Sequence, residues 1–299
     1  MKVAVLLALY NGMKWINEQV NSILNQEKVH VHIFISIDPS NDGSQEWAQK
    51  LACTNKQVTL LETNEKYGSA APNFFRLIKD VDFSDYDFIA YADQDDIWNK
   101  NKLYRAIQII KNNNYDAYSS NVIAFWPDGD KKLIKKSQAQ VKWDFLFESA
   151  GPGCTFVLTK TLALDLKKFI IKNSKEMKLV WLHDWFTYAF ARSNNYKWYI
   201  DEKPSLLYRQ HLGNQVGANK GLSAIIYRAK FILAGKAMKQ SSLLASLLDL
   251  ENNSFVKKWH NHSRLGFLKL ARHAKQCRRK PTDRLFFVIS CLVLFLLGN

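Results

Sequence analysis

Cysteine is scarce in this chain, with four residues among 299, and no two of them form a C-x-x-C pair. Zinc sites and disulfide frameworks need cysteines at short, regular spacings, so neither is expected here. We therefore expect a protein of a reducing compartment, the cytoplasm. The apolar stretch at residues 3–9 is too short for the core of a secretory signal peptide with its cleavage site, so export by that route is not expected.

Several motifs that bind phosphate or carry nucleophiles are also missing. The sequence contains no G-x-G-x-x-G, no G-x-x-x-x-G-K-[ST] and no G-x-S-x-G. Their absence disfavours dinucleotide-dependent oxidoreductases, P-loop enzymes and serine hydrolases with a nucleophile elbow. Internal repeats and low-complexity segments are absent too, while a hydrophobic content of 47% is enough for a folded globular protein.

The formal net charge of +15 is concentrated in one part of the chain. From Lys220 onward there are 15 Lys and Arg residues and three acids, a net charge of +12, so residues 1–219 are nearly neutral. A basic nucleic-acid-binding protein stays open as an alternative of a different class, and salt-sensitive binding to DNA or RNA would favour it. Because the charge alternates with apolar helical faces, a membrane surface is favoured and no nucleic acid partner is expected.

The basic segment ends in an apolar run of thirteen residues, 285–297, with Arg278, Arg279, Lys280 and Arg284 before it. At ~1.5 Å per residue a helix of this length reaches roughly 20 Å, short of the ~30 Å hydrocarbon core of a bilayer. We therefore expect an interfacial or re-entrant helix at the inner face of the cytoplasmic membrane, and a peripheral protein. The alternative is a helix that packs on the domain.

Strand and helix patterns alternate through residues 1–125. Apolar stretches predict strands near 3–9, 29–37, 58–61 and 88–92, and apolar residues at helical spacing follow each strand. Asn99 is expected to cap the fourth of these helices. Such alternation predicts an α/β fold with a doubly wound, mostly parallel, Rossmann-like sheet.

The pattern changes twice further along the chain. Residues 126–219 show short strands and helices near 161–172 and 183–192, and this half is expected to shape an acceptor side. Residues 220–299 read as basic helices, which predicts a helical C-terminal extension that associates with a membrane.

Three carboxylates, Asp93, Asp95 and Asp96, follow the fourth predicted strand within four residues, with Gln94 between them. Ligands of open α/β sheets bind beyond the carboxyl ends of the strands, which gives this position weight. Clustered carboxylates repel one another unless they are solvated or neutralised, and hard oxygen ligands suit Mg²⁺ or Mn²⁺. The cluster therefore predicts a divalent metal site that leaves coordination positions free for phosphates. The alternative is a solvated acidic turn that begins the next helix.

Polar groups also follow the first three predicted strands. Tyr10 and Asn11 follow the first, residues 64–73 follow the third, and Asp38 stands where the second strand stops. From there its carboxylate could accept hydrogen bonds from a base or ribose. A simple turn with Ser44 as a helix cap explains the stretch after Asp38 equally well.

Seven strings carry a resemblance to a known family. They are ALYNG, SIDPSNDGS, NEKYGSAAPNF, YADQDDIW, GPGCTFV, LHDWF and YRQHLGNQVGA. In the order and spacing of these strings the sequence resembles the GT-A-fold family 2 glycosyltransferases, and within them a rhamnosyltransferase-like branch of bacterial polysaccharide biosynthesis such as that of O antigen and capsule. The resemblance covers about residues 3–219 and implies a GT-A domain at 1–219, with a nucleotide-sugar-binding half and an acceptor half.

The resemblance also implies roles for individual residues. Asp184 would be the general base, and Asp38 would read the pyrimidine base, although Ile37 and Pro39 depart from the family pattern beside it. Donor-binding residues would be Tyr10, Asn11, Asp38, Gly68, Asn73, Asp93 and Arg209. Metal ligands would be Asp93, Asp95 and His211, and further candidates are Asp96, Gln94, His183 and Trp185.

Each assignment has a structural alternative. Asp184 could begin a helix, Arg209 could pair with a surface acid, and His211 could be satisfied by neighbouring groups. The aromatic residues Trp181, Trp185, Phe186 and Tyr188 are expected to pack in the core, because aromatic residues at helical spacing usually do.

Together these features predict an inverting, metal-dependent hexosyltransferase. We expect it to move L-rhamnose from dTDP-rhamnose to a lipid-linked or growing bacterial surface glycan. The metal would neutralise the departing diphosphate while Asp184 takes the acceptor proton in a single displacement. The same fold with a UDP-hexose donor is the alternative within this class.

Overall fold

A seven-stranded sheet lies at the centre of the structure, a computed structural model in which residues 1–62, 66–211 and 235–297 are described. The strands lie in the order β10-β6-β9-β4-β1-β2-β3, and neighbours run parallel except that β9 is antiparallel to β4 and β6. This confirms the predicted mostly parallel sheet. The strands are β1 (Lys2–Leu9), β2 (His30–Ile37), β3 (Val58–Leu60), β4 (Phe88–Ala92), β6 (Ala117–Ser120), β9 (Val157–Thr159) and β10 (Trp198–Asp201).

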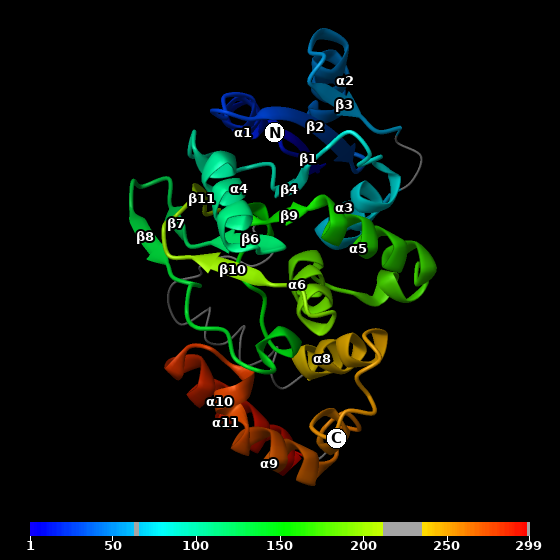
Figure 1. The fold of residues 1–299 in the computed structure, drawn as a ribbon, viewed down its shortest axis with the longest axis vertical. Coiled ribbons are helices and arrows are strands. Elements are labelled where there is room, and N and C mark those ends of the chain that lie inside the picture. Colours follow the sequence, from blue (N-terminus) through cyan, green and yellow to red (C-terminus); the bar gives the residue numbers. More distant parts are fainter. Residues whose placement is uncertain (63–65, 212–234, 298–299) are drawn as a thin grey trace.

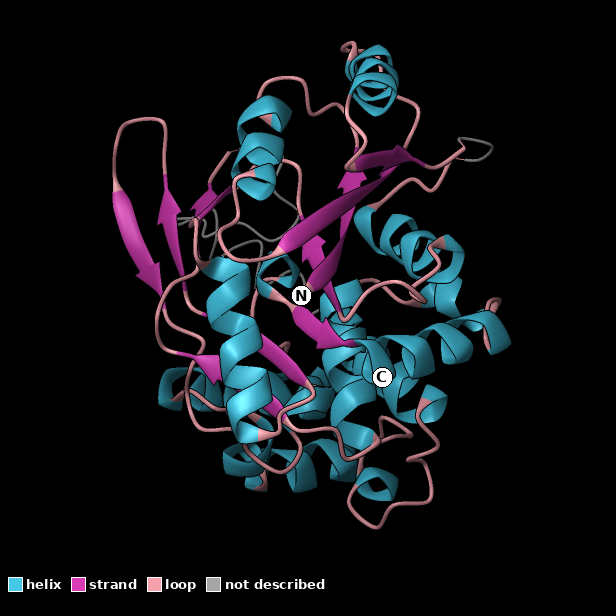
Figure 2. Ribbon diagram, turned by 45° about the horizontal axis from the view of Figure 1, so that its top comes forward, coloured by secondary structure: helices cyan, strands magenta, loops and turns pink. Residues whose placement is uncertain are grey.

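Helices cover both faces of this sheet (Figures 1 and 2). Alternate residues of β1 point to opposite faces, so Val3 and Val5 pack in one core while Ala4 and Leu6 pack in another. The arrangement confirms a doubly wound fold. The Val3 core is completed by α1 (Ile16–Leu24), α2 (Ser44–Thr54) and α4 (Lys102–Asn113), and the Leu6 core by α3 (Ala70–Asp80), α5 (Lys160–Lys172) and α6 (His183–Ser193).

A second, four-stranded sheet lies beside the first. Its order is β5-β11-β7-β8, with β11 parallel to β7 and antiparallel to β5. Since β5 directly follows the carboxylate turn after β4, its pairing with β11 brings residues 206–209 next to that turn. The strands are β5 (Ile97–Trp98), β7 (Val122–Phe125), β8 (Lys131–Ile134) and β11 (Leu206–Arg209).

The expected cap at Asn99 is wrong. The helix α4 begins at Lys102 with Asn101 at its N-cap position. Because Ile97 and Trp98 pair with β11, the chain turns later than the apolar pattern suggests, and the amide of Asn99 donates to the carbonyl of Pro204 at 3.1 Å. A polar residue does precede the helix, as predicted, but the short strand β5 places the start of the helix three residues after Asn99.

The C-terminal helices form a separate layer below α6 (Figure 1). The predicted boundary between residues 219 and 220 lies outside the described residues. Trp259 is fully buried in this layer and contacts Phe147 of the N-terminal part, with ring centroids 5.2 Å apart. The extension is therefore packed onto the domain. Its helices are α8 (Lys236–Leu247), α9 (Arg264–Arg272), α10 (Ala274–Cys277) and α11 (Pro281–Leu297).

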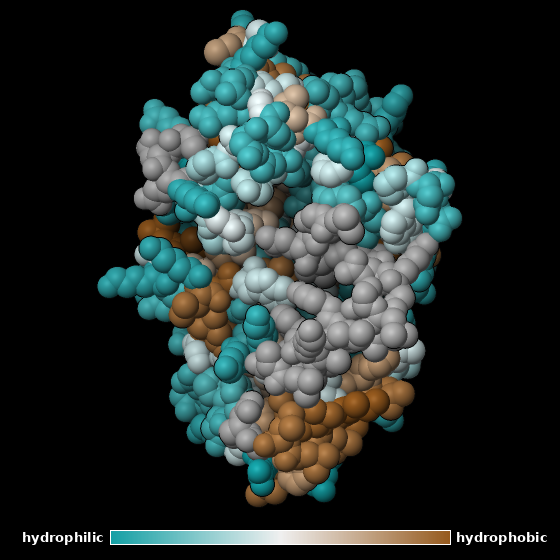
Figure 3. Space-filling view, turned by 180° about the vertical axis from the view of Figure 1, so that it is seen from behind, coloured by the Kyte–Doolittle hydropathy of each residue, from teal (hydrophilic) through white to brown (hydrophobic). Residues whose placement is uncertain are grey.

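The apolar run of α11 has two environments. Cys291 and Leu294 are buried against the other helices, as the packing alternative required. The other side of α11 is exposed, and together with Leu265 of α9 it forms an apolar patch at one end of the molecule (Figure 3). None of the helices in the described ranges is long and apolar enough to cross a membrane. The exposed members on α11 are Leu285, Phe286, Ile289, Leu292, Leu296 and Leu297.

Candidate active site

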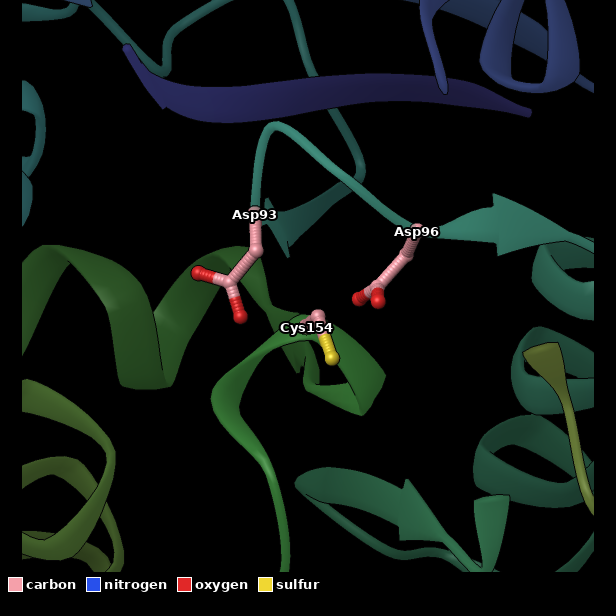
Figure 4. A group of neighbouring side chains, drawn as sticks. All are labelled: Asp93, Asp96 and Cys154. Carbon is pink, nitrogen blue, oxygen red and sulfur yellow. The ribbon is translucent and has the colours of Figure 1, made fainter. Parts of the chain in front are cut away.

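The carboxylate turn after β4 lies at the carboxyl end of the central sheet. Asp96 is fully buried, Asp95 is 8% exposed, and Asp93 is half-buried. Ligand atoms of Asp93, Asp96 and Cys154 all lie within 4.8 Å of one another, and the two carboxylates flank the thiol (Figure 4). Cys154 reaches this position from the short 3₁₀ turn Gly153–Thr155. The solvated acidic turn of the sequence alternative is therefore wrong for Asp95 and Asp96.

Burial and mutual repulsion dominate the electrostatics of this cluster. Desolvation, followed by the charges of Asp95 and Asp184, raises the pKa of Asp93 to about 7. The same causes, burial first and then Asp95 and Asp93, raise the pKa of Asp96 well above its ordinary value. Burial also raises the pKa of the Cys154 thiol, which keeps it neutral at pH 7.

Basic side chains lie around the cluster. The side chain of Lys102 is buried beside it, and burial lowers the pKa of its ammonium group despite attraction from Asp96 and Asp93. From β11, the backbone N–H of Arg209 donates to Asp96 at 3.2 Å, and its guanidinium donates to the carbonyl of Asp95 at 2.8 Å. Arg209 also forms an ion pair with Glu18 of α1, as the structural alternative for this residue required.

His211 completes this side of the site. Its Nε2 lies 2.6 Å from a carboxylate oxygen of Asp95, and its ring stacks on Trp15 with centroids 4.1 Å apart. Two of the three predicted metal ligands, Asp95 and His211, are thus in direct contact. Carboxylate oxygens with one imidazole nitrogen fit a hard divalent cation such as Mg²⁺ or Mn²⁺, whereas the neutral thiol of Cys154 does not.

The loop after β1 is tied to the carboxylate turn by Gln94. The Gln94 side chain accepts from the N–H of Tyr10 at 2.7 Å and donates to the carbonyl of the same residue at 2.8 Å. Asn11 has a left-handed backbone with φ of 46°, and its N–H donates to Ser40 at 3.0 Å. The ring of Tyr10 is 54% exposed. Gln94 therefore shapes the site through the backbone, and the Tyr10 ring is available to a ligand.

Asp38 holds a second loop. Its carboxylate accepts the backbone N–H groups of Tyr67 and Gly68 at 2.7 and 2.9 Å. Gly68 has a φ of 76°, a conformation that side-chain-bearing residues rarely adopt. Asp38 thus fixes the position of this loop at the end of β2. The helix α2 beyond it begins at Ser44 with Gly43 at its N-cap position, so the expected Ser44 cap is wrong. The carboxylate of Asp42 accepts from the N–H of Ser44 at 3.0 Å.

Asn73 lies inside the fold. It is 3% exposed, and its amide donates to the carbonyl of Ser36 at 3.2 Å. This hydrogen bond links α3 to β2, and a donor contact of Asn73 stays a prediction. Asn73 lies on the inward face of α3, beside the buried Phe74.

The first turn of α6 carries His183, Asp184 and Trp185. Burial raises the pKa of Asp184 to about 6 and lowers that of His183 to about 3, so the imidazole is neutral at pH 7. The His183 ring stacks on Phe74 at 3.8 Å, and neither ring nitrogen has a hydrogen-bond partner within the described ranges. Asp184 therefore combines a raised pKa with a position near Asp93, the combination expected of a proton acceptor.

Trp185 belongs to the core. It is 6% exposed, and its indole donates to the carbonyl of Phe145 at 2.9 Å, which excludes it as an open sugar platform. Phe186 and Tyr188 are fully buried, as predicted. The expectation for Trp181 is wrong, because it is 37% exposed in the turn before α6.

Gly153 brings the loop before β9 directly against α6. A Cβ atom at this position would lie 2.6 Å from Nε2 of His183 and 3.2 Å from Cβ of Asp184. The string GPGC marked this loop in the sequence, but nothing there indicated that Gly153 contacts His183 or that Cys154 lies beside Asp93 and Asp96. Lys102 and Glu18 were also missed, because a single charged residue in a helix pattern usually lies in solvent.

Comparison with known proteins identifies the family. The model named glycosyl transferase family 2 matches residues 4–164, slightly more than half of the chain. The chain belongs to glycosyl transferase family 2. The dTDP-rhamnosyl transferase RfbG of Shigella flexneri is 42% identical over 288 residues, 96% of this chain and 99% of that protein. The UDP-Glc:alpha-D-GlcNAc-diphosphoundecaprenol beta-1,3-glucosyltransferase WfgD of Escherichia coli is 28% identical over 54% of this chain and 61% of its own length.

Solved structures share the fold of this glycosyltransferase. TarS of S. aureus, residues 1–349 in complex with UDP-GlcNAc, has a TM-score of 0.53 at 15% identity, covering 99% of this chain and 89% of that one. The mannosyltransferase PcManGT of Pyrobaculum calidifontis, in complex with GDP-Man and Mn²⁺, has a TM-score of 0.52 at 16% identity, covering 98% and 86%. At these identities the likeness concerns the GT-A fold alone.

The Gly153 contact yields a prediction. Gly153→Ala should lower the rate of sugar transfer by about 10²-fold, because the new methyl group displaces His183 and Asp184 by a fraction of an ångström or more. Steady-state transfer assays on folded protein measure this. In a His183→Ala background, Gly153→Ala should lower the transfer rate little further, because the imidazole ring that the new methyl group would meet is absent. A further loss of about 10²-fold in the double variant would contradict this contact.

Proposed function

We propose that this glycosyltransferase moves L-rhamnose from dTDP-rhamnose to a hydroxyl of a lipid-linked or growing bacterial surface glycan, with inversion at the anomeric carbon. The relative from Shigella flexneri, named as a dTDP-rhamnosyl transferase, supports the donor because its identity extends over nearly the full chain. The observation that carries the reaction is the proximity of two carboxylates in one site, Asp93 after β4 and Asp184 at the start of α6. A UDP-hexose donor is the alternative, and the glucosyltransferase relative favours it.

Asp93, Asp95 and His211 would hold Mg²⁺ or Mn²⁺. They fit because the cluster is buried and self-repelling, and because the ligand atoms are oxygen and imidazole nitrogen. When bound, such an ion supplies positive charge that stabilises the departing diphosphate. The guanidinium of Arg209 would contact the same diphosphate, exchanging its exposed partner Glu18 for the phosphate oxygens.

The remaining donor contacts would come from the loops at the ends of β1 and β2. Tyr10 offers an exposed ring on which a base can stack, and Asn11 offers a side chain in the adjoining turn. The carboxylate of Asp38 already accepts two backbone N–H groups, one of them from Gly68. Its oxygens have further lone pairs, so it can hold this loop and accept from the pyrimidine base at the same time.

Asp184 would accept the proton of the acceptor hydroxyl. In one displacement the acceptor oxygen bonds to the anomeric carbon while the bond from that carbon to the diphosphate breaks, and the proton passes to Asp184. Attack from the side opposite the leaving group inverts the configuration. The neutral imidazole of His183, whose two ring nitrogens have no partner among the described residues, would hydrogen-bond to a sugar hydroxyl.

The donor and the metal can be tested together. Purified protein should release dTDP from dTDP-rhamnose in the presence of Mg²⁺ or Mn²⁺ and lose this activity in chelator. Asp95→Ala should abolish transfer and weaken donor binding, because it removes a metal ligand and the partner of His211. A panel with UDP-hexoses distinguishes the alternative donor. Full activity in chelator would exclude the metal role, and salt-sensitive DNA or RNA binding without any donor turnover would favour the nucleic-acid alternative.

Asp184→Asn should lower the transfer rate by about 10²–10⁴-fold while the donor dissociation constant changes by only a few-fold. The base must be ionised, and burial raises its pKa to about 6. The wild-type rate should therefore be constant above that pH and fall about tenfold per unit below it. Rates measured from pH 4.5 to 8 at saturating substrates test this. Near-normal transfer by folded Asp184→Asn would place the base elsewhere.

The acceptor glycan would be presented at a membrane surface to which the protein attaches. The apolar patch on α11 and α9 lies in the segment with net charge +12, a combination that suits the anionic inner leaflet of the cytoplasmic membrane. Peripheral attachment there would place the site beside a lipid-carried glycan. The exposed rings and branched chains would enter the interface while Lys and Arg side chains contact lipid head groups.

The double substitution Leu285→Ser and Phe286→Ser should release the protein from anionic vesicles, because both side chains are 62% exposed. Vesicle sedimentation at low and high salt measures binding, and high salt should weaken only the electrostatic part. Leu133→Ser, on the 52% exposed Leu133 of β8, is the matched control and should leave binding unchanged. Equal binding by wild type and the double variant would show that this patch does not hold the protein on lipid.

A further inference from the structure

The segment that leads to Gly153 lies between α6 and the C-terminal helices. On one side Asp144 accepts from the hydroxyl of Tyr188 at 3.0 Å and from Arg192 at 3.1 Å, both on α6. On the other side the N–H of Trp143 donates to the carbonyl of Gln276 in α10 at 2.8 Å. Residues 143–153, here called the bridging segment, thus contact both the helix that begins with Asp184 and the basic extension.

Arg279 enters the bridging segment from the extension. Its side chain is fully buried, and its guanidinium lies 3.3 Å from Glu148 and 3.6 Å from Asp144 while donating to the carbonyl of Ser149. Its backbone N–H donates to the other oxygen of Glu148 at 2.7 Å. A planar guanidinium can make these contacts at once, whereas the point charge of a lysine cannot. A buried cation that contacts two carboxylates and a carbonyl of one segment fixes the position of that segment.

Two short routes run from Arg279 to Asp184. The first passes through Ser149, whose hydroxyl donates to the carbonyl of Gly151 at 2.9 Å and lies close enough to the carboxylate of Asp184 to donate to it instead. The second passes through Asp144 to Tyr188, one turn beyond Asp184 on the same helix. The loop and the helix that bracket Asp184 are therefore both held by one side chain of the extension.

The extension in turn holds Arg279 in place. Arg284, in the first turns of α11, donates to the carbonyl of Arg278 at 2.8 Å and to that of Arg279 at 2.9 Å. Phe287 of the same helix packs on Phe147 with ring centroids 5.1 Å apart. Removal of α11 would disturb the active site as well as any membrane contact.

We propose that Arg279 is a positioning residue for the reaction, which holds the bridging segment so that Asp184 is aligned with the acceptor hydroxyl. The proposal rests on the proposed function of Asp184. It assigns the basic extension a part in catalysis that is separate from its proposed part in membrane attachment.

Arg279→Gln should lower the transfer rate of folded protein at least tenfold at saturating substrates, with the donor dissociation constant changed by only a few-fold. The transfer rate of Arg279→Lys should lie between the rates of the wild type and Arg279→Gln, because lysine keeps the positive charge but cannot make the planar contacts of the guanidinium. Added guanidinium ion should restore part of the rate to Arg279→Gln and none to Asp184→Asn. The exposed neighbour Lys280 provides the control, and Lys280→Gln should transfer as the wild type does.

A double-mutant cycle separates positioning from general stability. If Arg279 acts through Asp184, then Arg279→Gln should have little further effect in an Asp184→Asn background. Additive losses, parallel loss of donor binding, or an unchanged rate in folded Arg279→Gln would each overturn the proposal. If Arg279→Gln does not fold, the same cycle with Glu148→Gln decides the question, because this substitution weakens the contact between Arg279 and the bridging segment from the other side. The single variant Asp184→Asn tests the proposed base, and the cycle tests the positioning role of Arg279. Failure of one proposal can therefore be distinguished from failure of the other.

Discussion

The structure depends on the confinement of several carboxylates in one partly buried site. Asp93, Asp95 and Asp96 follow one strand, and Asp184 lies across the site from them, so burial and mutual repulsion raise the pKa of Asp93 and Asp96. Such a group is stable only when opposite charge or a cation lies nearby. Arg209 on β11 supplies part of that charge, and the second sheet brings it to this point from more than a hundred residues away.

Much of this could be predicted from sequence because it follows from local periodicity. Strands buried on both faces gave continuous apolar runs, and the carboxyl-end rule then placed Tyr10, Asp38 and Asp93 at one edge. Errors arose where a local pattern had two outcomes. Asn99 is a good helix cap, but the two-residue strand before it pairs with β11 and the helix begins later.

Contacts between distant charges could not be predicted at all. The extension contains 15 Lys and Arg residues from position 220 onward, and sequence alone gives no means of selecting Arg279 as a buried one. Arg279 is distinguished only by Glu148 and Asp144, which lie in another part of the chain. The apolar run of α11 posed a related problem: a helix that is apolar all round can pack through Cys291 on one side and still expose Phe286 on the other.

The contact between Arg279 and Glu148 spans 131 positions of sequence, which has a consequence for the order in which the active site is completed. A ribosome makes the Asp93 and Asp184 segments long before it makes α11, and domains fold broadly in the order of their synthesis. A nascent chain can therefore assemble the sheet and its donor loops while the bridging segment is still loose. Such a chain would bind the sugar nucleotide before it is able to transfer the sugar. Maturation of this enzyme would then end with acquisition of catalysis, not of substrate binding.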